Sequence, residues 1–356
     1  MTALSSLTPD THAIITCDTQ HDAADWDDYV STHTDGTFFH RSGWSRAVKA
    51  AYGYDAHYIT ARKNGALTGV LVLTDAKTPL LGRSLVSSAF TVGGGPLADD
   101  PLTLAALLSA AETLGAKLQA NYVECRSGFS AEGWAPVTGL HASFSAPLIA
   151  KDQDALAAIP RKRRAEIRKA LDTAAQNGIT VHHDGEPELF YALYAQSLHR
   201  LGTPVFSKRF LTALLQEFEE ETEITVVEYQ GKPAAALLSF YFNGAVLPYY
   251  VGASGQARTS RAFDYIYWAV MRRAVEKGCD RFDFGRSKID SGAYQYKKLW
   301  GFEPQPLSYQ VKLINADSLP NVNAKNPKFS IFAKIWPHLP AFAANRLGPL
   351  LAPNFP

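Results

Sequence analysis

The chain has few cysteines, and they are not arranged for crosslinks or for a metal ion. Its 356 residues include three, Cys17, Cys125 and Cys279. An odd number without CxxC or paired Cys/His spacing argues against a disulfide framework and against a structural zinc site. No metal is expected, and a reducing, cytoplasmic setting is the simplest interpretation.

The sequence also lacks an excess of charge of either sign. Its 35 basic and 34 acidic side chains leave a formal net charge of +1. No overall field therefore attracts a nucleic acid, and any site for a polyanion must be a local basic patch.

Long apolar segments are absent as well. No window approaches the roughly 18 to 20 apolar residues that a membrane-spanning helix needs. The N-terminal MTALSSLTPDTHAIITCD lacks the basic and then apolar pattern of a signal peptide. With 46% hydrophobic and 12% aromatic residues, the chain can bury one large core or two ordinary ones, and its length slightly favours two domains.

What the chain does contain is an internal repeat. HYITARKNGALTGVLVLTDAK predicts two strands around a turn at Gly65, and ITVVEYQGKPAAALLSFYFNG predicts the same around Gly231. In each half a short strand, an amphipathic helix and a strand ending in Arg-Ser follow, with the helices expected at 102–114 and 262–277. Because the two turn glycines are 166 positions apart and the Arg-Ser endings 160, we predict two copies of one fold.

The stretch FDFGRSKIDSGAYQYKKLWGFEP follows the second repeat helix and combines several chemistry-bearing residues. Its alternation predicts a strand that ends at Gly285, followed by a polar loop at 286–288. A short helix at 293–300 should then end at Gly301, before a last strand at 307–313. The pattern indicates a functional site at the end of the strand.

This order of elements resembles the acyltransferase fold of the GNAT superfamily, in which a splayed sheet holds the acyl donor. AYQYKKLWGF looks like the superfamily's late helix with its tyrosine and Gly-Phe. The start of the second repeat helix departs from it, since GASGQARTSRAFDYIY lacks the spaced glycines of a loop that cradles the CoA pyrophosphate. The resemblance predicts an α/β (α+β) chain with two tandem GNAT-like domains, each a mixed, mainly antiparallel sheet flanked by helices.

Tandem halves without that loop resemble the FemAB family, the peptidoglycan-bridge aminoacyltransferases that use aminoacyl-tRNA as donor. FFHRSGWSRAVKAAYGY, SSAFTVGGGPLADD, PRKRRAEIRKAL and LHRLGTPVFSKRFLTALL resemble the branch found with exosortase (PEP-CTERM) and exopolysaccharide systems. The resemblance implies domains at 1–150 and 151–313, the second with the active site, and a tail at 314–356.

It also implies an acyltransferase that moves an acyl or aminoacyl group onto an amine of a cell-envelope, peptidoglycan-like or exopolysaccharide precursor. The donor is an aminoacyl-tRNA or an acyl thioester, used as a co-substrate, and no cofactor is expected. One alternative is an N-acyltransferase that depends on a CoA or carrier-protein thioester. Another is a non-catalytic carbohydrate-binding or scaffolding component of an exosortase system.

Three residues are the catalytic candidates. By resemblance, Lys297 stands where family members place a lysine against a donor phosphate, and a fixed ammonium there would stabilise negative charge. Arg286 could grip a carboxylate or phosphate with two parallel hydrogen bonds. Asp283 could accept a proton from the attacking amine, although it could equally form a structural ion pair with a neighbouring arginine.

Further residues are expected to contact substrate in the clefts of the two copies. These substrate-binding candidates are His40, Trp44, Arg200, Tyr250, Ser287, Lys288, Tyr296 and Trp300. For each the competing interpretation is a structural role, as a buried histidine, a core aromatic ring or a solvated lysine.

A basic helix should begin after Pro160. Arg161, Arg164 and Arg168 share one face by their spacing, and such a face could bind the phosphates of a tRNA. A solvated helix between domains explains the pattern equally well.

The last part of the chain combines cations with apolar residues. Beyond Asp317 it has no acid, and 327–356 could lie on a membrane surface at the inner face of the cytoplasmic membrane. The competing expectation is that this tail packs on its own domain.

Overall fold

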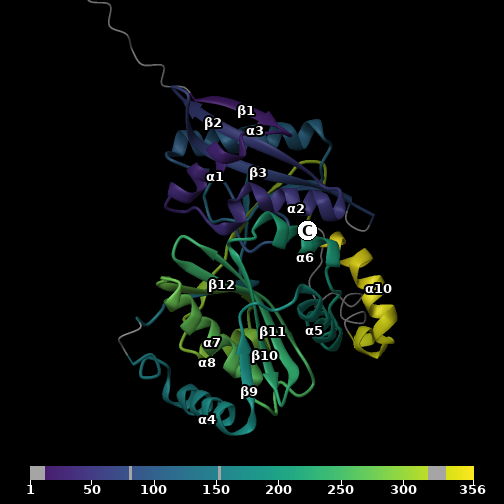
Figure 1. Ribbon diagram of the computed structural model, residues 1–356. Helices are drawn as coiled ribbons and strands as arrows, with labels where there is room; N and C mark the ends of the chain where they lie inside the picture. The colour runs from purple at the N-terminus through teal and green to yellow at the C-terminus, as the bar shows by residue number, and fades with distance from the viewer. Residues whose placement is uncertain (1–12, 80–81, 151–153, 320–333) are drawn as a thin grey trace, which may run out of the picture. The chain divides into compact units, whose positions relative to one another are not determined.

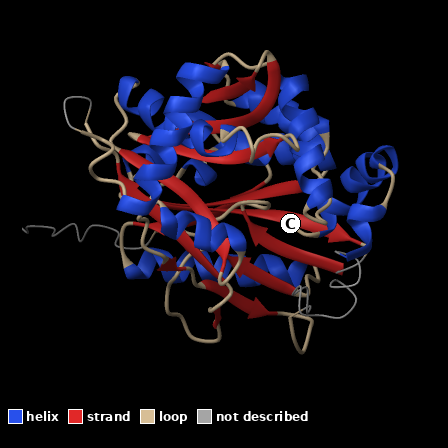
Figure 2. Ribbon diagram, turned by 90° about the horizontal axis from the view of Figure 1, so that it is seen from below, coloured by secondary structure: helices blue, strands red, loops and turns tan. Residues whose placement is uncertain are grey.

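The computed structural model describes residues 13–79, 82–150, 154–319 and 334–356 and divides them between two compact units (Figure 1). The first unit combines the N-terminal residues up to Lys49 with Gly53–Pro136 and Tyr309–Leu319. The second combines Ala50–Tyr52 and Val137–Ser308 with the C-terminal residues. Figure 2 shows strands flanked by helices, so the predicted α/β class is confirmed.

The first unit is built on one mixed sheet with the strand order β1-β2-β3-β4-β6-β15-β7, and β5 pairs with β3. Its strands are β1 (Ile14–Asp18), β2 (Asp55–Lys63), β3 (Ala66–Thr78), β4 (Gly82–Ser87), β5 (Leu97–Ala98), β6 (Tyr122–Cys125), β7 (Ala135–Val137) and β15 (Tyr309–Leu313). Its helices are α1 (Ala23–Thr32), η1 (Phe38–His40), α2 (Ser42–Tyr52) and α3 (Pro101–Lys117).

The second unit has a seven-stranded sheet with the order β14-β8-β13-β12-β11-β10-β9. Its strands are β8 (His141–Pro147), β9 (Ile179–His182), β10 (Thr222–Tyr229), β11 (Lys232–Phe242), β12 (Ala245–Ala253), β13 (Arg281–Lys288) and β14 (Gln305–Pro306). Its helices include α4 (Arg161–Asn177), α5 (Pro187–Arg200), α6 (Lys208–Glu217), α7 (Ala262–Glu276), α8 (Gly292–Leu299) and α10 (Ala341–Leu351), with η2 (Trp336–His338) and η3 (Ala352–Asn354).

The two units repeat one topology. In each, a two-residue turn closes an antiparallel hairpin, β2-β3 or β10-β11, and both turn residues have positive φ. Gly65 and Gly231 meet this requirement at φ 85° and 69° because they carry no Cβ. The first strand of each hairpin has a register shift before the turn, between Ala61 and Arg62 or between Val227 and Glu228. Later in each unit, a helix connects two parallel strands, β4 to β6 or β12 to β13.

Two strands pair with the sheet formed mainly by the other half of the sequence. β8 precedes residue 150 but pairs antiparallel with β13 in the second sheet. β15 ends the predicted second domain but pairs antiparallel with β6 in the first sheet. In each sheet, the strand that follows the connecting helix, β6 or β13, therefore completes its backbone hydrogen bonds with a strand from the other half of the sequence.

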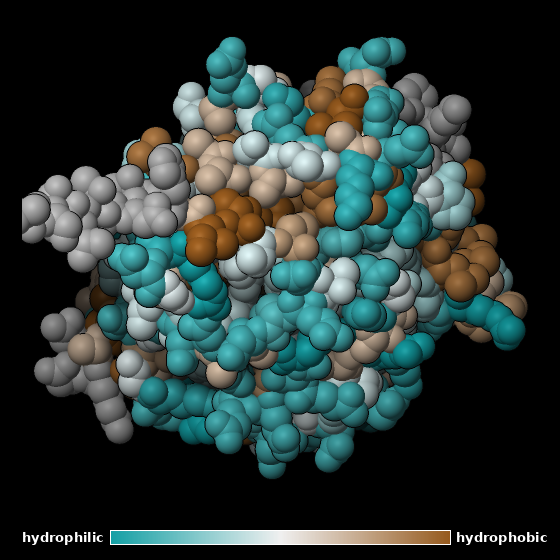
Figure 3. All heavy atoms as spheres, turned by 90° about the horizontal axis from the view of Figure 1, so that it is seen from above, coloured by the Kyte–Doolittle hydropathy of each residue, from teal (hydrophilic) through white to brown (hydrophobic). Residues whose placement is uncertain are grey.

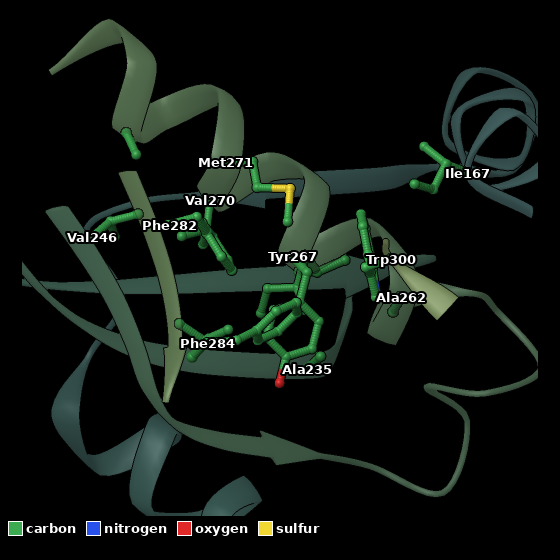
Figure 4. Packing of buried hydrophobic residues seen from close by; sticks show 14 of the residues in the cluster. Ile167, Ala235, Val246, Ala262, Tyr267, Val270, Met271, Phe282, Phe284 and Trp300 are labelled. Atoms are coloured by element: carbon green, nitrogen blue, oxygen red, sulfur yellow. The ribbon is translucent and has the colours of Figure 1, made fainter. Parts of the chain in front are cut away.

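Local sequence explains the ends of the repeat helices. Asp100 caps α3 by accepting hydrogen bonds from the amides of Leu102 and Thr103, and Pro101 occupies the first turn, where it needs no donor. Apolar side chains of α3 pack on the first sheet in a core with Leu71, Leu107 and Val123. α7 packs in the same way on the second sheet, in a larger aromatic core (Figure 4).

The described part of the tail packs on the second unit. α10 contacts α5 through one face, where Ala344 and Gly348 are buried. The opposite face leaves Phe342 79% and Leu350 68% exposed. Figure 3 shows one face of the molecule, on which separate hydrophobic patches lie in a mostly hydrophilic surface.

Candidate functional site

The second unit contains a pair of strands that separate after a short contact. β12 and β13 are paired in parallel at two positions, Ala245 with Arg281 and Val246 with Phe282. A bulge in β12 leaves Tyr249 unpaired opposite β11 shortly after these pairs. The facing edges of β12 and β13 therefore carry backbone donors and acceptors that a bound acyl or peptide-like group could pair with.

α5 approaches this part of β12 very closely. A Cβ on Gly252 would lie 2.3 Å from the backbone nitrogen of Tyr194 and 2.5 Å from the carbonyl carbon of Leu193. Both are backbone atoms of α5, so only glycine permits this packing. Ser197 of α5 also exchanges hydrogen bonds with the backbone of Ala253, which secures the end of β12.

A second bulge, in β13, brings Lys297 against the strand. The register shifts between Asp283 and Gly285, and Gly285 has φ 64°. The Lys297 ammonium of α8 donates hydrogen bonds to three successive carbonyls, those of Phe284 at 2.6 Å, Gly285 at 3.1 Å and Arg286 at 3.0 Å. All three ammonium N–H groups are thus used by the strand.

Burial changes the proton affinity of this lysine and its neighbour. Burial lowers the pKa of Lys297 to about 8, and the charge of Asp283 opposes the shift. Burial raises the pKa of Asp283, while a hydrogen bond from the Gly285 amide partly offsets it. By resemblance, Lys297 was predicted to meet a donor phosphate, and in the structure its ammonium is bonded to carbonyls at the β13 bulge.

Residues 286–288 were predicted to form a loop, and this was wrong. They continue β13 and pair with β8, Arg286 opposite Ser143 and Ser287 opposite Ala142. Successive side chains of a strand point to opposite faces, so Arg286 and Ser287 do not share one surface. Ser287 is buried, and its hydroxyl has no hydrogen-bond partner among the described residues, whereas Lys288 is exposed.

Tyr250 lies in an aromatic cluster next to the β12 bulge. Its ring meets those of Tyr194, Phe206 and Tyr249 at centroid distances of 5.5, 6.1 and 4.8 Å. Burial raises its pKa well above the usual range, and the positive charge of Arg286 opposes the shift. Its hydroxyl is buried without a hydrogen-bond partner in the described structure, so its capacity to donate is unused there.

Arg200, another candidate from the sequence, lies in the last turn of α5. Its guanidinium donates to the Ser197 hydroxyl at 3.2 Å and to the Ala253 carbonyl. Arg200 is thus brought to the end of β12, near the separated strands, with part of its donor capacity already used.

Tyr296 and Trp300 are held together by an arginine that the sequence analysis missed. Arg163 donates to the Tyr296 hydroxyl at 2.8 Å and to Asp264 at 2.6 Å. Its guanidinium lies 4.3 Å from the Trp300 ring centroid and 4.8 Å from that of Tyr296. Arg163 is only 6% exposed, and through these contacts it connects α4, α7 and α8 in the interior of the second unit. Arg163 lies four positions before the buried Ile167, on the same face of the helix, and this spacing could have identified it as a buried residue.

The predicted phosphate-binding face of α4 is only partly available. Arg161 and Arg168 are exposed. Arg164 instead donates to the carbonyls of Ala157 and Ile159, which immediately precede the helix.

The N-terminus of α7, where a CoA pyrophosphate loop would lie, has its amides already bonded. The Phe263 amide donates to the Ala257 carbonyl, and those of Asp264 and Tyr265 donate to the Arg261 carbonyl. Arg261 has φ 61°, a left-handed conformation that a glycine adopts more readily. The acidic Asp264 also stands in the first turn, so neither the amides nor the charge of this turn favour an anion.

The first unit has its own cavity, with a volume of about 590 Å³. It lies where β4 and β6, paired at two positions, lead into the loops that follow them. The Gly93–Gly95 loop forms one wall, and the start of α3 forms another. Polar groups that line it include Asp35, Asp99, Asp100, Arg126 and Ser127.

His40 lines this cavity but has both ring nitrogens occupied. Nδ1 accepts a hydrogen bond from the Thr37 amide at 3.0 Å, so Nε2 carries the proton and donates to the Gly95 carbonyl at 3.0 Å. Burial lowers the pKa of His40 to about 4, and the neutral ring positions the glycine loop. Trp44 is fully buried and donates to the Ala89 carbonyl, so it supports the structure behind the wall.

Arg126 is the cation of this cavity, and the sequence analysis noted it only as part of the repeat. It is 7% exposed and donates to Glu124 at 2.9 Å and to the Thr91 carbonyl at 3.0 Å. A buried arginine held in this way presents a fixed positive charge to the cavity that it lines.

Comparisons with known proteins agree with this architecture. Residues 161–298 match the family described as acetyltransferase (GNAT) domain. The crystal structure of FemX superposes with a TM-score of 0.68 at 16% identity, covering 83% of this chain and 97% of that one. A tandem GNAT protein from the clavulanic acid biosynthesis pathway gives 0.52 at 13%, covering 86% and 100%. The C-terminal domain of a candidate lysylphosphatidylglycerol synthetase from Agrobacterium fabrum gives 0.53 at 14%, covering 88% and 96%.

A search of the curated proteins finds no match to this chain. The structural likenesses confirm the predicted tandem GNAT-like fold, and the match of residues 161–298 to the acetyltransferase (GNAT) domain supports an acyltransferase. Such a domain uses an acyl donor and an acceptor. None of the helices in the part of the chain that the structure describes has the length and apolar character that crossing a bilayer requires.

Proposed function

We propose that this GNAT-type acyltransferase moves an aminoacyl or acyl group onto an amine of a cell-envelope or exopolysaccharide precursor. The observation that carries the proposal is the separation of β12 from β13 next to the unpartnered hydroxyl of Tyr250. Such a site offers backbone groups to hold an acyl chain and a buried donor for the oxygen that becomes negatively charged.

In the reaction, the acceptor amine attacks the donor carbonyl, a C–N bond forms, and the bond to the leaving oxygen or sulfur breaks. Tyr250 donates a hydrogen bond to the carbonyl oxygen, and the Arg286 guanidinium balances the charge that develops nearby. Lys297 keeps the bulge of β13 in place. The amine proton is transferred to Asp283, whose raised pKa suits it to hold a proton, and then to the leaving group.

An ester donor such as an aminoacyl-tRNA fits the second unit better than a CoA thioester does. The amides at the start of α7 are bonded within the chain, so a pyrophosphate has no cradle there. Exposed Arg161 and Arg168 on α4 offer phosphate contacts to a tRNA. A CoA or carrier-protein thioester remains the second candidate, favoured by the match to an acetyltransferase domain.

Taken by itself, the first unit's cavity suits binding of a polar ligand that carries both an amine and an acidic group. It combines carboxylates, which attract an ammonium group, with the guanidinium of Arg126, which can bind a carboxylate or phosphate. A precursor of the envelope or of an exopolysaccharide carries both kinds of group. The assignment to exosortase systems rests on the sequence resemblance, and so does the alternative of a non-catalytic carbohydrate-binding component.

The tail adds a contact with the cytoplasmic face of the membrane, where lipid-linked precursors are found. Of the residues 327–356, on which this was predicted, 327–333 lie outside the described structure. In the described part, Ile335 is 56% exposed together with Phe342 and Leu350, and Lys334 and Arg346 are exposed as well. Apolar side chains with cations and no acid favour an anionic lipid surface. Phe342→Asp should therefore reduce cosedimentation with anionic vesicles and leave transfer between water-soluble substrates unchanged.

The test of function offers two labelled donors, mixed aminoacyl-tRNA and acyl-CoA, to wild type and Tyr250→Phe with amine-bearing nucleotide-sugar precursors. We expect label to appear on the precursor from aminoacyl-tRNA, and Tyr250→Phe to transfer about 100-fold more slowly. Transfer from acyl-CoA alone would establish the thioester alternative. Precursor binding without transfer from either donor would contradict an enzyme and favour the binding module.

A further inference from the structure

The second unit also contains a cavity, which lies away from the separated ends of β12 and β13. Its volume is about 280 Å³, and its single contact with β13 is Phe282, at the end of that strand where β12 is still paired. The separated ends of β12 and β13 are beyond the bulges. The two sites therefore use different ends of the same strand.

The walls of this cavity are almost entirely apolar. They come from the end of β8, residues 148, 149, 155, 158 and 159, the second half of α7 and the turn after α8. Met271, Phe282 and Trp300 belong both to the lining and to the buried core (Figure 4). The remaining apolar lining residues include Leu148, Ile149, Ile159, Trp268, Val275 and Phe302.

Among the described residues that line the cavity, the charged one is Arg272. It is partly buried and forms no hydrogen bond or ion pair with any residue that the structure describes. The next residue differs, because Arg273 pairs with Glu223 and Glu276. The guanidinium of Arg272 is therefore available to an anionic ligand in the cavity.

We propose that this cavity binds a single-chain amphiphile of the fatty-acid class, with its tail among the apolar walls and its carboxylate on Arg272. The apolar lining removes the tail from water, and the planar guanidinium takes the carboxylate with two parallel hydrogen bonds. The volume of about 280 Å³ is just below the roughly 300 to 1,000 Å³ typical of ligand cavities, so a short or medium chain fits. This site is independent of the proposed transfer reaction.

The experiment titrates the purified full chain with decanoate and with decanol by calorimetry, below the concentrations at which either aggregates. We expect decanoate to bind at one site per chain, and decanol, which has the same tail without the charge, about tenfold more weakly. Arg272→Gln should lower decanoate affinity to that of decanol. Val275→Trp, which fills the cavity, should abolish binding of both.

The matched control is Arg209→Gln, because Arg209 on α6 is exposed and does not line the cavity. It should bind decanoate like wild type. Equal decanoate affinity in wild type, Arg272→Gln and Arg209→Gln would overturn the proposal, and so would the absence of decanoate binding. Should Val275→Trp not fold, the comparison of Arg272→Gln with Arg209→Gln decides alone. Binding to anionic vesicles but not to monomeric decanoate would refute the single-chain ligand and point to a membrane contact.

Discussion

Lys297→Ala should destabilise the second unit as well as slow transfer. The ammonium satisfies three carbonyls of β13, and Lys297 is 9% exposed, so water replaces it poorly. Each buried carbonyl left without its hydrogen-bond donor costs about 1 to 3 kcal/mol. Relaxation of the bulge recovers part of the total for the three carbonyls. We expect a loss of about 2 to 4 kcal/mol in the free energy of unfolding, or roughly 5 to 15 °C in melting temperature.

The assay is urea unfolding followed by circular dichroism, with Lys298→Ala as the matched control. Lys298 is the exposed neighbour on the same helix, and its loss should change stability by less than about 0.5 kcal/mol. From the sequence alone, Lys297→Ala is expected to leave the melting temperature almost unchanged, as for a lysine that contacts only substrate. If Lys297→Ala lost activity but kept its stability, the structural role of Lys297 in the β13 bulge would be refuted. The result would instead support direct contact between Lys297 and the substrate.

The pH dependence gives an independent check on the same lysine. The folded-state pKa of about 8 lies below the ordinary value of 10.5, so the unfolded chain binds more protons at this site between those values. This contribution to the free energy of unfolding therefore rises with pH from about 8 to 10.5. Wild type should gain stability relative to Lys297→Met across that window, and a flat or falling difference would contradict the burial of a charged lysine.

Three further predictions concern other parts of the two units. Tyr250→Phe should leave the melting temperature unchanged or slightly higher, since its hydroxyl has no described partner, and a clear loss of stability would show a missed structural bond. Arg163→Ala should cost about 3 to 5 kcal/mol in urea unfolding because it leaves Asp264 without its partner, whereas Arg161→Ala should cost less than about 0.5 kcal/mol. His40 should stay neutral in nuclear magnetic resonance titrations down to about pH 5, and stability present above 6.5 should be lost as pH falls towards 4; a midpoint near 6.5 would contradict its burial.

The sequence by itself determined the local elements. The turn at Asn64-Gly65 specified a tight hairpin because both residues tolerate positive φ, and the structure has that hairpin and its repeat at Gln230-Gly231. The helix predicted at 262–277 is α7, at Ala262–Glu276, because its apolar periodicity is a property of consecutive residues. The repeated order of these elements was enough to predict two GNAT-like halves.

Tertiary structure alone decided the pairing of strands and the partners of the site residues. β8 and β15 pair with strands from the other half of the sequence, and no local pattern specifies which open strand edge they complete. Lys297 is adjacent in sequence to an exposed lysine with the same chemistry, yet the β13 bulge surrounds only Lys297 with carbonyls. Arg163 likewise differs from the exposed Lys162 beside it through partners that are distant in sequence, among them Asp264, 101 positions away. Helices and turns follow from short-range chemistry, whereas the roles of buried cations depend on which distant backbone and side-chain groups the fold brings to them.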